Sequence, residues 1–69
     1  MRLRLKINGV EEAISVTTVS ELLAARGVDP TARFLAVAVN GAVVRRSEWC
    51  SKYLGPGDEV EIVRPFSGG

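Results

Sequence analysis

The sequence predicts a small α+β domain, in which one helix covers one face of a mixed sheet of about five strands. Near both ends of the chain, apolar residues alternate with charged ones, which is typical of half-buried strands. Between these segments, one short stretch changes to the spacing of a helix. A chain of 69 residues is long enough for one core only, which we place at residues 1–64, followed by a flexible C-terminal Gly-Gly tail at residues 65–69.

The chain opens with a predicted hairpin. In residues 2–7, RLRLKI, leucine and isoleucine alternate with basic side chains, which we interpret as a solvated strand face. Asn8-Gly9 follows, and both residue types adopt the positive φ of a tight turn. We place the returning strand at residues 12–16, and Glu11-Glu12 after the turn either lengthens the hairpin or forms a bulge.

A helix is predicted at residues 19–26. In TTVSELLAARG, the valine and the two leucines are spaced to form one apolar stripe. Thr18 and Glu21 match a capping box, in which each side chain accepts a hydrogen bond from a backbone N–H of the first turn. Gly27 lies where a left-handed C-terminal cap belongs.

Three further strands complete the predicted sheet. Residues 34–39, FLAVAV, are apolar on both faces and indicate an interior strand. Residues 42–45 return from a second Asn-Gly turn, and the alternating residues 59–63, EVEIV, form the last strand. Between these two strands, SEWCSKYL is irregular or forms one 3₁₀ turn that Ser47 caps. Hairpin, helix, strand pair and last strand follow one another in the order of a β-grasp fold.

Composition excludes several classes of function. A net charge of +1 with both signs interspersed argues against nucleic acid as a partner. No apolar run approaches the roughly 20 residues of a membrane helix and no signal peptide is recognised, so we expect a cytoplasmic protein without membrane contact. One cysteine and no histidine leave neither a disulfide nor a Cys/His zinc site, and we expect no metal, no permanently bound cofactor and no role for Cys50.

Several segments together resemble one known family. VAVN at residues 37–40, Trp49, GDEVEI at residues 57–62 and the final Gly68-Gly69 are similar to the sulfur-carrier protein of thiamine thiazole biosynthesis. That family is ubiquitin-like in its β-grasp fold and in its Gly-Gly end. The resemblance extends over the whole chain, because INGV near the N-terminus and the predicted helix also fit.

The resemblance implies a defined chemistry. A ubiquitin-activating-like adenylating enzyme consumes ATP to convert the Gly69 carboxylate into an acyl-adenylate. Sulfur from a persulfide donor then replaces AMP, and a thiazole synthase uses the resulting thiocarboxylate. The chain would be a protein cosubstrate and not an enzyme, so we expect no catalytic residue within it.

The tail contains the predicted site of modification, which is Gly69. Gly68, Ser67 and Phe66 are the predicted partner-binding tail. Glycine at the last two positions leaves no Cβ near the reacting carbon, so a narrow cleft can close on bare backbone. Phe66 either enters the groove of the partner or folds back on the domain.

The sheet face that the helix leaves uncovered is a possible docking face. Its predicted residues are Ala36, Ala38, Val63 and Arg64. Trp49 and Tyr53 are interpreted as core or rim residues, and Asp58 as a hydrogen-bonding loop residue. Three other functions stay open: a sulfur carrier for molybdopterin or another sulfur-transfer pathway, a ubiquitin-like protein modifier, and a plain binding module with an idle tail.

Overall fold

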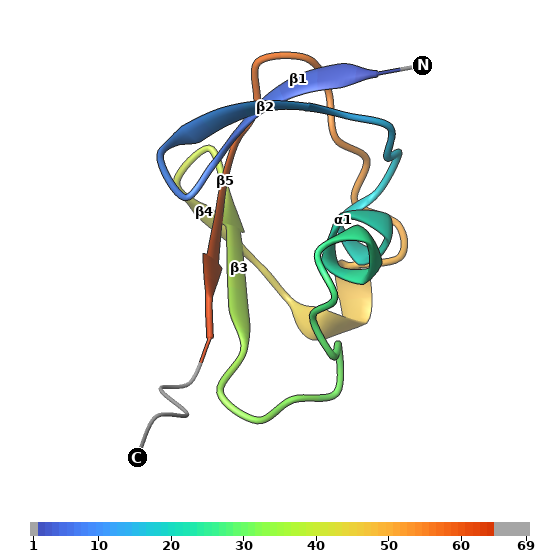
Figure 1. Cartoon of the computed structure of the whole chain (residues 1–69). Coiled ribbons are helices and arrows are strands. Elements are labelled where there is room, and N and C mark those ends of the chain that lie inside the picture. The colour runs from blue at the N-terminus through green and yellow to red at the C-terminus, as the bar shows by residue number, and fades with distance from the viewer. Residues whose placement is uncertain (1, 65–69) are drawn as a thin grey trace.

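The computed structural model of the chain describes residues 2–64 (Figure 1). The strands are β1 (Leu3–Ile7), β2 (Val10–Ile14), β3 (Ala36–Val39), β4 (Ala42–Val44) and β5 (Glu59–Val63). They form a five-stranded sheet in the order β2-β1-β5-β3-β4. β1 and β5 are parallel, and the other neighbouring pairs are antiparallel. The helix α1 (Val19–Ala25) lies on one face of this sheet, so the predicted mixed sheet with one covered face is confirmed.

Both Asn-Gly dipeptides form two-residue turns with positive φ at both positions. The angles are 50° and 84° in Asn8-Gly9, and 52° and 83° in Asn40-Gly41. Such a turn makes the last residue of β1 pair directly with the first residue of β2. The returning strand therefore runs from Val10 to Ile14, and its placement at residues 12–16 was wrong. The pairing is continuous through Glu11-Glu12, so these residues form no bulge.

The caps of α1 agree with the sequence in part. The Thr18 Oγ1 accepts a hydrogen bond of 3.2 Å from the Glu21 N–H, as predicted. The Glu21 carboxylate accepts one of 2.7 Å from the Thr17 N–H, which lies one residue before the expected donor. The helix ends at Ala25, one residue before the predicted end, and Gly27 adopts the left-handed conformation with φ 70°.

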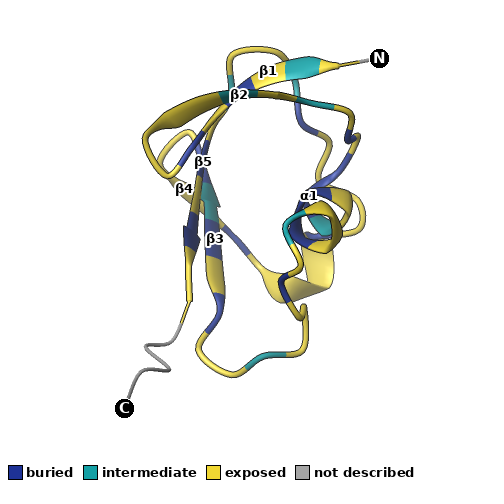
Figure 2. Cartoon of the chain, viewed as in Figure 1, coloured by how far each residue is buried: buried dark blue, intermediate teal, exposed yellow. Residues whose placement is uncertain are grey.

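The core lies between α1 and the inner face of the sheet (Figure 2). Its largest side chains below 2% exposure are Leu5, Ile7, Val19, Leu22, Leu23, Val37 and Val60. Trp49 also belongs to this core: it is buried, and its indole N–H donates to the Val44 carbonyl at 2.9 Å. Tyr53 is instead 68% exposed. The predicted core or rim packing is therefore confirmed for Trp49, which lies in the core, whereas Tyr53 is not part of the core.

The remaining elements differ from the sequence prediction at their ends. β3 begins at Ala36 and not at residue 34, and β4 ends at Val44 and not at residue 45. The irregular segment contains a 3₁₀ turn, η1 (Arg46–Glu48), and Ser47 lies inside this turn rather than capping it. η1 has no side-chain cap, because Arg45 occupies its N-cap position.

One partly buried ion pair joins β2 to the end of the helix. Arg26 Nη1 donates to both carboxylate oxygens of Glu12, at 2.7 and 2.6 Å. Glu12 lies on the helix side of β2, opposite the buried Leu5, and Arg26 is the helix C-cap. A charge-assisted bond of this kind is stronger than a fully exposed pair, so it helps to hold the edge strand against the helix.

We expect Leu22→Ala to reduce the free energy of unfolding by about 2–5 kcal/mol, because it leaves a cavity at a fully buried site. That loss is large against the roughly 5–15 kcal/mol by which a small domain is stable. Val10→Ala is the control at a 59% exposed strand position. Denaturant unfolding measures both, and equal losses in the two variants would contradict the assigned core.

Candidate functional site

Three strands end or begin at the side of the sheet where β5 ends. Val63, the last residue of β5, lies opposite Ala36, the first residue of β3. β4 runs antiparallel to β3, so Val44 ends at the same side. We call this side, formed by Ala36, Val44 and Val63, the tail end of the sheet, since residue 64 follows directly. Figure 1 shows the loop that enters β3 at the same end of the molecule.

The predicted modification site and tail residues cannot be placed at this end. Gly69, Gly68, Ser67 and Phe66 lie outside the described residues, as does Pro65. The division of the chain into a domain and a flexible tail therefore stays a prediction.

Three of the four predicted docking residues come together on the uncovered face. Ala36 lies opposite Val63, and Ala38 lies opposite Glu61 on β5 and Val43 on β4. Val63 is 60% exposed and Val43 is 77% exposed. We call Ala36, Ala38, Val43 and Val63 the outer patch. The sequence analysis missed Val43, although the Asn-Gly turn places it opposite Ala38 and would have identified it.

The other half of the uncovered face is charged. Arg4 and Lys6 of β1 are exposed on it, as the alternation predicted. Arg4 forms an exposed ion pair of 3.6 Å with Glu11 of β2, and Lys6 lies opposite Glu59 of β5. The apolar side chains of this face are therefore concentrated on β3, β4 and the end of β5. Arg64 follows Val63 directly and is exposed.

The loop before β3 exposes an aromatic residue in a strained conformation. Phe34 has a φ of 62° and is 81% exposed, whereas the next residue, Leu35, is buried. The left-handed conformation costs a non-glycine residue about 1–2 kcal/mol. The sequence analysis placed Phe34 in a strand, because an apolar run carries no signal for a single residue with positive φ.

Side-chain contacts hold this loop at Asp29, Thr31 and Ala32. Arg46 Nη2 donates to the Ala32 carbonyl at 2.8 Å, and its guanidinium lies 4.8 Å from the ring centre of Trp49. The Asp29 carboxylate accepts from the hydroxyl and the N–H of Thr31, at 2.7 and 2.9 Å. These hydrogen bonds, with a smaller contribution from the Arg46 charge, hold the pKa of Asp29 below its usual value. The loop that carries Phe34 is thus held by polar contacts.

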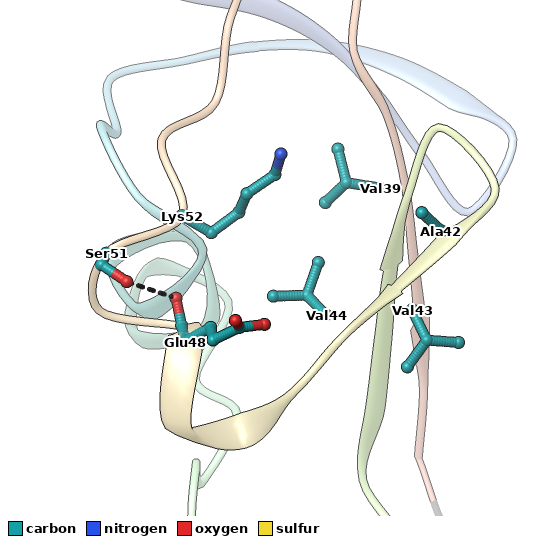
Figure 3. Close-up of a pocket in the computed structure, with 7 residues that line it drawn as sticks. All are labelled: Val39, Ala42, Val43, Val44, Glu48, Ser51 and Lys52. Carbon is teal, nitrogen blue, oxygen red and sulfur yellow. Dashed lines mark hydrogen bonds between the residues drawn. The ribbon is translucent and has the colours of Figure 1, made fainter.

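A groove of about 380 Å³ runs along the edge strand β4 and shares Val43 with the outer patch (Figure 3). Its lining residues are Val39, Ala42, Val43, Val44, Glu48, Ser51 and Lys52. Figure 3 shows Val39 and Val44 facing the segment after η1, from which the Lys52 side chain extends. Of the predicted site residues, none lines this groove.

The other chemically active side chains have structural contacts. Asp58 accepts hydrogen bonds from the Asn40 amide at 3.0 Å and from the Gly55 N–H at 2.8 Å, so its prediction as a loop hydrogen-bonding residue is confirmed. Cys50 is exposed, and the Ser20 hydroxyl lies 3.3 Å from its sulfur. Among residues 2–64, no group of His, Cys, Asp and Glu side chains suits a metal ion. In the same range, no helix has the length and hydropathy needed to cross a membrane.

This five-stranded mixed sheet with one helix on one face is the β-grasp fold, and it defines a small α+β protein. The chain belongs to the ThiS family, which its sequence matches over residues 4–69. The expected family, that of the sulfur carriers of thiamine biosynthesis, is thereby confirmed.

Two solved structures from Geobacter metallireducens are similar to this chain over nearly its full length. The crystal structure of the thiamine biosynthesis protein ThiS is 30% identical, with 100% of both chains covered and a TM-score of 0.77. The NMR solution structure of a thiamine biosynthesis protein is 30% identical, with 97% of this chain and 88% of that chain covered and a TM-score of 0.79. No curated protein matches the sequence.

We expect Phe34→Gly to raise the free energy of unfolding by about 0.5–1 kcal/mol. Glycine relieves the positive φ, which outweighs its greater entropy in the unfolded chain. Phe34→Ala is the matched control, because it removes the ring and keeps the strained Cβ. Chemical denaturation compares the three proteins. A loss of stability in the glycine variant would show that the ring packs usefully in the folded domain.

Proposed function

We propose that this chain is a sulfur carrier for thiazole formation in thiamine biosynthesis. Its Gly69 carboxylate is adenylated by a partner enzyme and converted to a thiocarboxylate. The observation that carries the proposal is membership of the ThiS family, with a match that includes the Gly68-Gly69 residues. The thiamine biosynthesis proteins of similar structure support the pathway.

The chemistry begins with an unactivated carboxylate. An α-carboxyl group has a pKa of about 3.3–3.7, so at neutral pH Gly69 carries an anion that can attack the α-phosphorus of ATP. Pyrophosphate leaves, and the acyl-adenylate that forms has AMP as a good leaving group. The terminal sulfur of a persulfide then attacks the acyl carbon and displaces AMP. Thiol cleavage of the remaining S–S bond leaves the thiocarboxylate on the carrier.

The domain contributes a docking surface, and the tail contributes reach. Residues 65–69, if extended, span at most about 17 Å, which is enough to enter a catalytic centre while the domain stays at the surface of the partner. We assign docking to the outer patch with Arg64 and tail contacts to Phe66, Ser67 and Gly68. The absence of a Cβ at the last two positions lets the partner enclose the acyl carbon closely.

The partners follow from this sequence of steps. An adenylating enzyme supplies the ATP chemistry, a persulfide donor supplies the sulfur, and a thiazole synthase consumes the thiocarboxylate. The carrier itself acts as a cosubstrate of both enzymes. Its docking must be transient, because the same tail has to leave one partner before it reaches the next.

Incubation with ATP, the purified adenylating enzyme of the thiamine pathway from the same organism and a persulfide donor should replace one oxygen of Gly69 by sulfur. Intact-mass spectrometry, followed by fragmentation of the tail, measures this change. Gly69→Ala should lose most of it with unchanged circular dichroism, because a methyl group lies beside the attacked carbon. Ser67→Ala is the control for a small change in the tail. Normal sulfur loading of Gly69→Ala would contradict the proposed site.

The outer patch makes a separate prediction. Ala36→Gln should weaken binding to the adenylating enzyme about tenfold, because it places a neutral polar side chain in an apolar contact. Ala13→Gln is the matched control, since Ala13 is exposed opposite Arg4 in the charged half of the same face. Titration calorimetry measures both affinities. Equal affinities of the two variants would remove the outer patch from the interface.

A further inference from the structure

Three arginines from separate segments surround the tail end of the sheet. Arg64 follows β5, Arg45 follows β4, and Arg33 lies in the loop before β3. All three are exposed. β4 and β5 flank β3, and neighbouring strands lie about 4.8 Å apart, so the Cα atoms of Arg45 and Arg64 are separated by roughly 10 Å. We call Arg33, Arg45 and Arg64 the arginine collar.

The collar is one pole of an uneven charge distribution. Asp29 and Glu48 are the carboxylates of the neighbouring loop and turn, and they offset it only in part. At the other end of β5, Asp58 precedes the strand and Glu59 begins it, so the charges at the two ends of the strand differ in sign. Within residues 2–64, the ion pairs formed are Arg4–Glu11 and Arg26–Glu12, and neither involves the collar. Its charge is therefore directed to solvent.

Phe34 lies inside this basic region, next to Arg33. Phe34 is 81% exposed and its backbone is strained, so the loop conformation lowers the stability of the domain without burying this side chain. The Arg46–Ala32 hydrogen bond and the stacking of Arg46 on Trp49 hold the loop in place. An exposed aromatic side chain flanked by arginine has the composition of an interface hot spot.

We propose that the arginine collar and Phe34 dock on an acidic protein surface whose apolar pocket receives the Phe34 ring. This inference rests on the proposed function, because the partner is the adenylating enzyme that receives the tail. Charge complementarity selects this partner: three exposed cations attract a carboxylate-rich rim, and the adjoining outer patch is apolar and fits protein. The collar raises the association rate by steering, and Phe34 slows dissociation by desolvated packing.

Association and dissociation rates of the purified adenylating enzyme, measured by biolayer interferometry at about 20 and about 500 mM NaCl, test the two roles separately. The double variant Arg33→Glu, Arg45→Glu should associate about tenfold more slowly at low salt, and the difference should shrink at high salt. Arg2→Glu is the control for a single charge reversal, because Arg2 is exposed just before β1, at the side of the sheet away from the collar. It should change the association rate less than about twofold. Phe34→Gly should dissociate about tenfold faster at both salt concentrations.

Equal association rates for the double variant and Arg2→Glu would overturn the collar. An unchanged dissociation rate of Phe34→Gly would overturn the pocket for the ring. Circular dichroism and unfolding midpoints confirm that the compared variants are folded. Sulfur loading of the wild-type chain separates the two proposals. If the wild-type chain gains sulfur normally and all variants bind like wild type, the docking element, which is the arginine collar with Phe34, is overturned alone. A wild-type chain that neither binds this enzyme nor gains sulfur overturns the proposed function and the docking element with it.

Discussion

The structure depends on the insertion of the last strand, β5, into the centre of the sheet. β5 pairs in parallel with β1 and antiparallel with β3, and it thereby joins two hairpins that are otherwise separate. Asn8 secures this junction from the first turn, because its N–H donates to the Val60 carbonyl at 2.9 Å and its side-chain oxygen accepts from the Ile62 N–H at 2.8 Å. Closing a contact across most of the chain is entropically costly, and the burial of Leu5, Val37 and Val60 on the three interior strands offsets this cost.

The central position of β5 also decides where function can be located. A last strand at a sheet edge would direct the following residues along a flank of the domain. Here the chain continues to residue 64 from the centre of the sheet, beside Ala36 and the loop that carries Phe34. Apolar and basic side chains from four segments are thus gathered around one exit. In the proposed function, a partner that binds the tail also contacts this surface, because residue 64 follows Val63 beside Ala36.

A single helix covers one face of the sheet, and the other face has a charged half and an apolar half. Around β1 and β2, charged side chains alternate with the core residues, and cross-strand pairs of opposite sign keep that half in water. Around β3 and β4, small and β-branched apolar residues stay exposed. A domain with so small a core is only marginally stable, and the proposed docking would account for the strain at Phe34 and the exposure of Val43.

Local signals in the sequence determined much of this protein. The Asn-Gly turns, the helix with its Thr18 and Gly27 caps, and the bounds of β5 were all predictable, because each depends on φ preferences or periodicity within a few residues. The family was predictable from motifs spread over the whole chain. The Asn8-Gly9 turn also sets the register of β2, which the sequence analysis placed two residues too late. Only the tertiary structure placed β5 between β1 and β3.

The candidate site divides in the same way. Ala36, Ala38 and Val63 were predictable as one face, because alternation puts them on the side opposite the core residues. Val43 was predictable as well, because the Asn40-Gly41 turn pairs it with Ala38. The left-handed Phe34 and the meeting of Arg33, Arg45 and Arg64 were decided by the tertiary structure. These residues are distant in sequence and converge only because strand pairing places the ends of β3, β4 and β5 at one side of the sheet.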